Sequence, residues 1–380
     1  MNRINRLTRL IGNQFQCQRY YSTNTNEVLI DEQGKVINIL LNRPEALNAL
    51  SLPMVRKLTP LYQRLHQSKD GDAVVVMKGA GGKAFCAGGD IRSIYDTNNP
   101  KTRNPSVRPD DTFFREEYVL NNMIGTNPVP QVSIYNGFTM GGGVGLSIHG
   151  RFRVATDNTV FAMPETGIGF FCDVGGSYFL PRLAHHTGMY LGLTGAKIKG
   201  KDCYITGVAT HYIPNARVPE LEKALAALSS PTESAVNEVL DSFHEKVDIN
   251  DNSLISSKFQ LIEKTFSKRS VEQIIEALKA DGSDWSKQNI STLSKMSPTS
   301  LKVVYQQIVN GGQLPTLADC LKMELRMAQT FVENNDFFEG VRALLVDKDK
   351  NPKWKPETLE QVTDSMVAKY FDTHGHDLKL

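Results

Sequence analysis

Two carboxylates, Glu165 and Asp173, lie close together in the stretch FAMPETGIGFFCDVGG, which spans residues 161–176. Apolar residues and glycines surround them, so the pair is surface charge, a metal site or a working acid/base pair. No third ligand and no histidine spacing accompanies the two acids, which disfavours a metal site. Two carboxylates that share a pocket push their pKa values apart, which is how acid/base roles are divided.

Two glycine-rich segments are suited to hold an acyl group beside such acids. KAFCAGGDIR (83–92) places Gly89 just before Asp90, a good N-cap for the helix that follows, and GFTMGGGVGLS (137–147) places three glycines at a helix start. Helix N-termini leave peptide N–H groups unpaired, and glycine lets a ligand approach them closely. One N–H from each segment could grip a thioester oxygen, contributing about 3–4 kcal/mol per donor. Tight helix–sheet packing is the alternative use of each segment alone.

Other catalytic motifs fail on spacing. The segment 78–84 lacks the Ser or Thr that a phosphate loop needs after Lys83, and no G-x-G-x-x-G spacing occurs. Ser147 lacks the second glycine of a nucleophile elbow, since His149 stands there. Cys172 has no histidine placed as a partner, so we expect a packed thiol rather than a nucleophile.

The elements that must position these residues alternate between strands and helices up to about residue 215. Continuous apolar runs indicate buried strands, and apolar residues at helical spacing indicate covering helices. We therefore predict an α/β fold with helices packed on a mostly parallel sheet. The expected strands are 35–42, 73–79, 130–137, 152–156 and 160–164, and the expected helices are 52–65, 113–125 and 140–150.

From about residue 216 onward the pattern becomes a series of amphipathic helices. Two polar stretches, 229–237 and 281–289, are predicted to be loops between them. The predicted organisation is a core at residues 22–215 and a helical region at 216–380 that packs on this core.

The first 21 residues differ from the rest of the chain because they contain four arginines and no acid. Their apolar residues recur at helical spacing, so a basic amphipathic helix typical of a mitochondrial transit peptide is expected at residues 1–21. Removing them leaves 39 basic residues (43 − 4) against 41 acidic ones. This balance argues against a nucleic-acid partner, and no apolar run approaches the length of a membrane span. The five cysteines show no disulfide or zinc spacing, so a reducing compartment is expected.

Four segments, in order, carry a resemblance to a known superfamily. LNRPEALNAL (41–50), AFCAGGD (84–90), GGGVGLS (141–147) and PETGIGFFCDVGG (164–176) are similar to the crotonase, or enoyl-CoA hydratase, superfamily. The resemblance implies a spiral of stacked ββα turns, an acyl-CoA substrate, no cofactor or metal, and an oxyanion hole built from two peptide N–H groups. Carried over by motif, those donors are Gly89 and Gly142.

The acids indicate a subgroup within the superfamily. Hydratases use one glutamate at the place of Glu165 and a second at the place of Gly145, so half of that pair is missing here. An acid instead stands at Asp173, which resembles the thioester-hydrolase branch. That branch also implies a substrate-binding role for Glu117 in FFREEYVLNN (113–122). Substrate contacts are thus expected from Glu117, Gly142, Glu165 and Asp173.

The resemblance leaves two chemical routes open. Glu165 either attacks the thioester carbonyl to give a mixed anhydride or activates a water that attacks it, with Asp173 orienting water or the substrate hydroxyl. A hydratase or isomerase of the same fold and a non-catalytic component of mitochondrial ribosomes are the rival interpretations. The implied location is the mitochondrial matrix, and the sequence leaves a homo-oligomer open.

Overall fold

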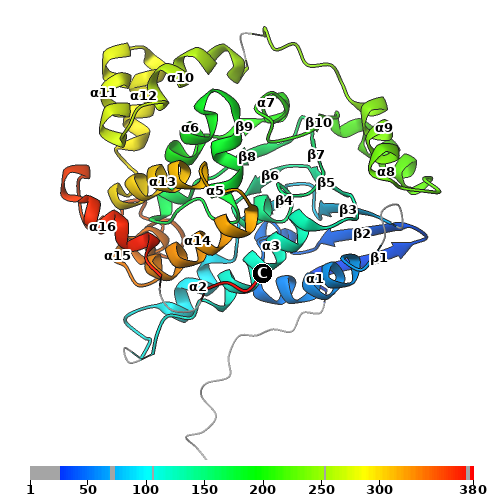
Figure 1. The fold of residues 1–380 in the computed structure, drawn as a ribbon, viewed down its shortest axis with the longest axis horizontal. Coiled ribbons are helices and arrows are strands. Elements are labelled where there is room, and N and C mark those ends of the chain that lie inside the picture. The colour runs from blue at the N-terminus through cyan, green and yellow to red at the C-terminus, as the bar shows by residue number, and fades with distance from the viewer. Residues whose placement is uncertain (1–25, 69–72, 105–106, 252–253, 374–376) are drawn as a thin grey trace, which may run out of the picture.

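The computed structural model describes residues 26–68, 73–104, 107–251, 254–373 and 377–380, so the predicted transit peptide at 1–21 lies outside the described residues. The described strands form a six-stranded sheet in the order β1-β2-β3-β5-β7-β10 and a four-stranded sheet in the order β4-β6-β8-β9 (Figure 1). Strand bounds are β1 Val28–Gln33, β2 Val36–Leu41, β3 Val74–Gly79, β4 Ala84–Ala87, β5 Gln131–Tyr135, β6 Phe138–Met140, β7 Phe152–Ala155, β8 Val160–Ala162, β9 Ile198–Lys199 and β10 His211–Tyr212.

The chain passes repeatedly from the first sheet to the second, as β3 to β4, β5 to β6 and β7 to β8. Pairing is parallel except between β1 and β2 and between β8 and β9. In the second sheet, Ala87 pairs with Met140 and Met140 pairs with Ala162. The carboxyl ends of β4, β6 and β8 therefore lie side by side, and the segments that follow them must meet.

Both faces of the six-stranded sheet are covered. On one face, Val74, Val76 and Val132 pack with leucines of helices α8 (Val218–Ala226) and α9 (Glu233–Phe243). The opposite face carries the main core, where Val75 and Met77 pack with residues from the other helices. This arrangement fits the near-continuous apolar sequence of the central strands, since each strand is buried on both sides. The α/β prediction is confirmed.

The remaining helices pack on the other face of the first sheet, on the second sheet and on one another. Helices α10–α12 lie at the opposite end from α8 and α9, and α14 packs against α3 (Figure 1). Their bounds are α1 Leu52–Leu65, α2 Ile91–Asn98, α3 Thr112–Thr126, α4 Gly142–Gly145, α5 Gly176–Phe179, α6 Thr187–Thr194, α7 Gly200–Ile205, α10 Phe259–Phe266, α11 Val271–Asp281, α12 Asp284–Leu293, α13 Pro298–Gly311, α14 Leu317–Phe331, α15 Asn335–Val341 and α16 Asp364–Ala368.

Three element predictions are wrong in detail. The stretches 229–237 and 281–289, predicted as loops, contain the starts of α9 and α12. Their polar residues are helix caps, since Thr232 and Ser283 accept hydrogen bonds from peptide N–H groups three residues ahead. The helix expected at 140–150 is only the short α4, because turns follow it directly.

Among the described residues, no helix combines the length and apolar character needed to cross a membrane.

Candidate active site

Three buried acids come from three different segments. Glu117 lies on α3, Glu165 opens a short 3-10 helix (Glu165–Ile168) after β8, and Asp173 lies just before α5. Their exposed fractions are 1% for Glu117 and 6% for each of the other two. Glu117 and Glu165 both lie close enough to Asp173 for its charge to raise their pKa values. The structure thus brings the predicted acids together, whereas neighbouring Glu116 faces outward and pairs with Arg56 at 2.7 Å.

The predicted oxyanion glycines adjoin these acids. A Cβ atom placed on Gly142 would lie 3.1 Å from the peptide nitrogen of Gly89 and 2.8 Å from Glu117 Oε1. A Cβ on Gly141 would lie 3.1 Å from Glu165 Oε1. Gly142 also opens α4, where N–H groups have no partner within the helix. Gly142 therefore lies next to the peptide nitrogen of Gly89 and the carboxylate of Glu117, and Gly141 lies next to that of Glu165.

The conformation of this segment requires glycine. Gly141 has a φ of 42°, in the left-handed region that side chains disfavour. Next to it, a Cβ on Gly143 would lie 2.2 Å from the carbonyl oxygen of Cys86, so this glycine serves close packing. The packing role is therefore observed at Gly143, and the oxyanion role of Gly142 stays a prediction.

Burial raises the pKa of all three acids. For Glu165 burial is the largest cause and the Asp173 charge adds to it; for Glu117 burial is again first, followed by the charges of Asp173 and Glu324. Burial also raises the pKa of Asp173, to about 7, although the Tyr118 hydroxyl donates a 3.0 Å hydrogen bond that lowers it. Near neutral pH the cluster therefore carries less than three full negative charges.

Several polar atoms in this cluster lack partners. Glu165 Oε2 and Glu117 Oε1 accept no hydrogen bond from the described residues, and neither amide atom of buried Asn121 is paired. Buried polar groups are almost always hydrogen-bonded in folded proteins. These unpaired atoms therefore leave hydrogen-bonding capacity that a ligand can use.

The position of the absent hydratase glutamate is closed by packing. A Cβ on Gly145 would lie 2.6 Å from Val174 Cβ and 2.9 Å from Asn121 Nδ2. Real Cβ atoms do not approach neighbours this closely, so a glutamate side chain has no room there. The packing around Gly145 therefore excludes the second hydratase glutamate from this position.

Two residues with rival interpretations are structural, as predicted. Asp90 caps α2 by accepting a hydrogen bond from the Ser93 N–H at 3.3 Å, and it also pairs with Arg43 at 3.1 Å. Cys172 is fully buried, and its Sγ lies 3.6 Å from the Gly192 carbonyl oxygen. Burial, with the nearby acids, raises the pKa of this thiol, so it is not an activated nucleophile.

Sequence reasoning missed Tyr118, Glu324 and Gln307. Tyr118 follows Glu117 on α3, and its hydroxyl donates a hydrogen bond to Asp173. Adjacent residues on a helix point in different directions, so the role expected for Glu117 did not extend to Tyr118. Glu324 is completely buried on α14. A signal for Glu324 exists, because it shares helical spacing with the apolar residues Leu317, Cys320, Leu321 and Ala328. An acid on the apolar face of a helix indicates a buried side chain that needs a hydrogen-bonding partner.

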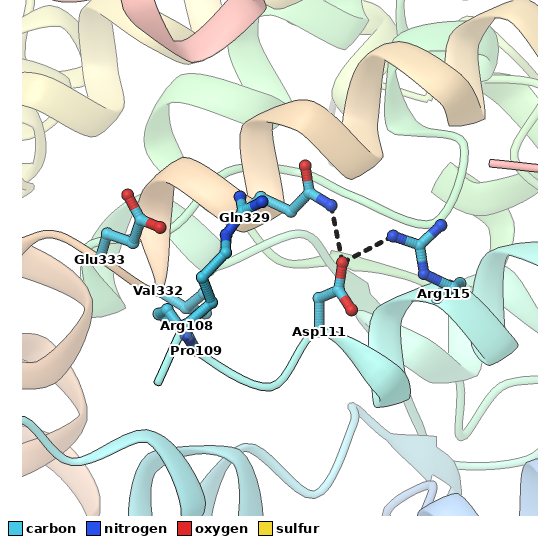
Figure 2. Close-up of a pocket in the computed structure, with 7 residues that line it drawn as sticks. All are labelled: Arg108, Pro109, Asp111, Arg115, Gln329, Val332 and Glu333. Atoms are coloured by element: carbon cyan, nitrogen blue, oxygen red, sulfur yellow. Dashed lines mark hydrogen bonds and ion pairs between the residues drawn. The ribbon is translucent and has the colours of Figure 1, made fainter. Parts of the chain in front are cut away.

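A separate pocket of about 320 Å³ lies between the start of α3 and α14 (Figure 2). Asp111 is bound there by Gln329 at 2.6 Å and by Arg115 at 2.8 Å. None of the three clustered acids lines it, and both of these hydrogen bonds go to Oδ2 of Asp111. The acid cluster is therefore the better candidate for chemistry. No group of three acidic, histidine or cysteine side chains in the described ranges is arranged to hold a metal ion.

Comparison with known proteins identifies the family of the chain. The model of the enoyl-CoA hydratase/isomerase family matches residues 36–371. The mitochondrial 3-hydroxyisobutyryl-CoA hydrolase of Dictyostelium discoideum is 54% identical and covers both chains completely. The human protein of the same name is 46% identical over 93% of this chain and 90% of its own.

Solved structures show the same fold. A carnitinyl-CoA dehydratase from Mycobacterium thermoresistibile superposes with a TM-score of 0.84 at 34% identity, covering 93% of this chain and 98% of its own. An enoyl-CoA hydratase from Rhodobacter sphaeroides gives 0.82 at 30% identity, covering 93% and 100%. The predicted crotonase-like fold is confirmed.

Proposed function

Since this chain belongs to the enoyl-CoA hydratase/isomerase family, we propose that its cluster of buried acids hydrolyses the thioester of 3-hydroxyisobutyryl-CoA. The products are 3-hydroxyisobutyrate and CoA, and the reaction is a step of valine breakdown. Relatives that match nearly the whole chain at 44–54% identity carry the name of this hydrolase, so the hydrolase prediction made from the sequence is confirmed.

In the proposed arrangement the thioester oxygen lies between the N–H groups of Gly89 and Gly142. These donors stabilise the negative charge that develops on this oxygen when the carbonyl carbon is attacked. Glu117 Oε1 would lie 2.8 Å from a Cβ on Gly142, which supports a position of that acid beside the acyl group. Its unpaired oxygen is then available to the substrate hydroxyl.

Glu165 is the proposed nucleophile or general base. As a nucleophile its carboxylate forms a bond to the carbonyl carbon, the C–S bond breaks, and CoA leaves as the thiolate. Water then opens the mixed anhydride and restores the carboxylate. As a base it removes a proton from the attacking water. Asp173, fixed by Tyr118, orients the water or the substrate hydroxyl in either route.

One observation carries the proposal: Glu165 is buried beside Gly141 with one unpaired oxygen, while packing closes the place of the second hydratase glutamate at Gly145. Addition of water to a double bond by this family's paired glutamates is therefore not available. Attack on the thioester carbonyl needs one acid and an oxyanion hole, for which we propose Glu165 and the N–H groups of Gly89 and Gly142.

The test is release of free thiol from a panel of short acyl-CoAs, including 3-hydroxyisobutyryl-CoA, compared with Glu165→Gln. The variant keeps the size of the side chain but not its charge, so a rate loss of about a hundredfold or more is expected. Equal turnover by parent and variant would overturn the role of Glu165.

The two routes separate in a single turnover with excess enzyme in ¹⁸O-water. Label recovered in Glu165 supports an anhydride opened by water at the enzyme carbonyl. Label found only in the product, with none in the enzyme, counts that route out.

Hydration of an enoyl-CoA is the second candidate, because two of the matching solved structures are a dehydratase and a hydratase. Assays of crotonyl-CoA hydration beside thioester cleavage decide between them. Hydration faster than cleavage would replace the hydrolase proposal.

Mitochondrial location is supported by the names of the relatives, and we place the protein in the matrix. The basic, acid-free segment 1–21 is the proposed address. Import into isolated mitochondria, followed by protease treatment with and without matrix opening, tests it. Retained import after removal of residues 1–21 would refute this role.

A further inference from the structure

The segment 172–177, called here the Asp173 loop, is held by side chains that lie far from it in sequence. Glu324 on α14 accepts hydrogen bonds from the peptide N–H groups of Gly175 at 2.7 Å and Ser177 at 2.8 Å. One bond goes to each of its carboxylate oxygens. Both oxygens of this buried acid therefore hold peptide groups shortly after Asp173, those of Gly175 and Ser177.

A second side chain holds the same loop from a neighbouring helix. Gln307 on α13 donates through Nε2 to the Cys172 carbonyl oxygen at 2.6 Å and to Ser177 Oγ at 3.0 Å. It is completely buried, like Glu324. Gln307 thus ties the residue before Asp173 to the end of the loop, and Glu324 ties the residues after it.

The loop conformation between these ties is strained. Val174 has a φ of 54°, which is unusual for a β-branched residue, and Gly175 follows at 86°. Strained backbone of this kind persists where surrounding contacts hold it. His149 Nε2 lies 2.8 Å from the Val174 carbonyl oxygen, so this nitrogen donates the hydrogen bond. Burial lowers the pKa of His149 to about 4, and the ring is neutral.

We propose that Glu324 and Gln307 are positioning residues, which hold the Asp173 loop in the geometry that thioester hydrolysis requires. Neither touches the reacting atoms; each acts by fixing the backbone on one side of Asp173. The C-terminal helices α13 and α14 therefore take part in catalysis through the loop they bind. The inference rests on the proposed role of Asp173 in hydrolysis.

The carboxyl group at position 324 argues for this role over packing alone. Burial raises the pKa of Glu324 to about 8, although hydrogen bonds from the Ser177 and Gly175 groups lower it. An acid in an apolar helix face is costly to bury, and an apolar side chain would fill the same space at lower cost. Only an acceptor with two oxygens meets both N–H groups at once.

The test uses Glu324→Gln and Gln307→Met in the full chain, with kcat and KM measured for 3-hydroxyisobutyryl-CoA. Gln at 324 keeps the shape but turns a donor toward one of the two N–H groups, and Met at 307 keeps the length but removes both bonds. Each variant is expected to lower kcat about tenfold or more and to leave KM within about threefold, since the oxyanion glycines are untouched.

Leu278→Ala is the matched control, because Leu278 is buried on α11 and contributes nothing to the loop. It is expected to lower the melting temperature while kcat, measured well below that temperature, stays near the parent value. Should Glu324→Gln fail to fold, Gln307→Met decides on the same criterion. Folded variants with kcat within twofold of the parent, or no lower than in the control, overturn the positioning role.

Asp173→Asn in the same panel separates the two proposals. An inactive Asp173→Asn beside fully active Glu324→Gln and Gln307→Met refutes the positioning role alone. An active Asp173→Asn refutes the catalytic role of Asp173, and the positioning role with it. The expected result is loss of kcat in all three variants with retained kcat in Leu278→Ala.

Discussion

Replacement of Asp173 by asparagine should change how the stability of the fold depends on pH. Asp173 is buried, and its carboxyl has a pKa of about 7 against an ordinary value of 3.8. A folded-state pKa above the unfolded value means that the folded protein binds the proton more tightly. Stability from this group is therefore complete below pH 3.8 and is lost as pH rises to about 7. Asparagine cannot ionise, so the stability of Asp173→Asn does not fall in this way as pH rises.

The magnitude follows from the two pKa values. Across the window in which the unfolded group is ionised and the folded group is not, stability falls by about 1.4 kcal/mol per pH unit. Between pH 5 and 7 the parent should therefore lose about 2 kcal/mol relative to Asp173→Asn, because the folded group begins to ionise as pH nears its pKa of about 7. Removing the Asp173 charge also lowers the pKa values of Glu165 and Glu117, which acts in the same direction.

Urea unfolding at several pH values between 5 and 8 measures this difference. Asp111→Asn is the matched control: partial burial acts to raise the pKa of Asp111, but hydrogen bonds from Gln329 and Arg115 hold it below the ordinary value. The stability that the Asp111 carboxylate contributes is lost only as pH falls through the acid range. The unfolding free energies of Asp111→Asn and the parent should therefore differ by a constant amount above pH 5. Parallel curves for the parent and Asp173→Asn would refute the reasoning.

Three further changes test the neighbourhood of Asp173. Tyr118→Phe removes the hydrogen bond that lowers the pKa of Asp173, so the acid limb of the pH–rate profile should move to higher pH; an unmoved limb would contradict this. Gly145→Ala forces a Cβ to within 2.6 Å of Val174 Cβ, which should cost about 1–3 kcal/mol of stability in urea unfolding; unchanged stability would show that the site has room. Cys172→Ser should keep kcat within about threefold, because the thiol is buried with a raised pKa, and loss of activity would restore it as a nucleophile candidate.

Much of the site was readable from the sequence because its parts are local. Glu165 follows β8, Gly89 follows β4 and Gly142 opens α4, so each depends on a strand end or helix start that short motifs encode. The absence of an acid at Gly145 and the presence of one at Asp173 can be read directly from the sequence. The loop predictions at 229–237 and 281–289 failed because cap residues and loop residues share the same polar types.

What the sequence determined by itself was therefore the fold class, the inventory of acids and the glycines that adjoin them. The tertiary structure alone decided how those acids behave. Glu324 lies 149 residues from the Gly175 it holds, and Gln307 lies 135 residues from Cys172. Burial and charge–charge coupling depend on which segments pack together, and no local pattern encodes that packing. For this reason the raised pKa of Asp173 and the closure around Gly145 emerge only in the folded chain.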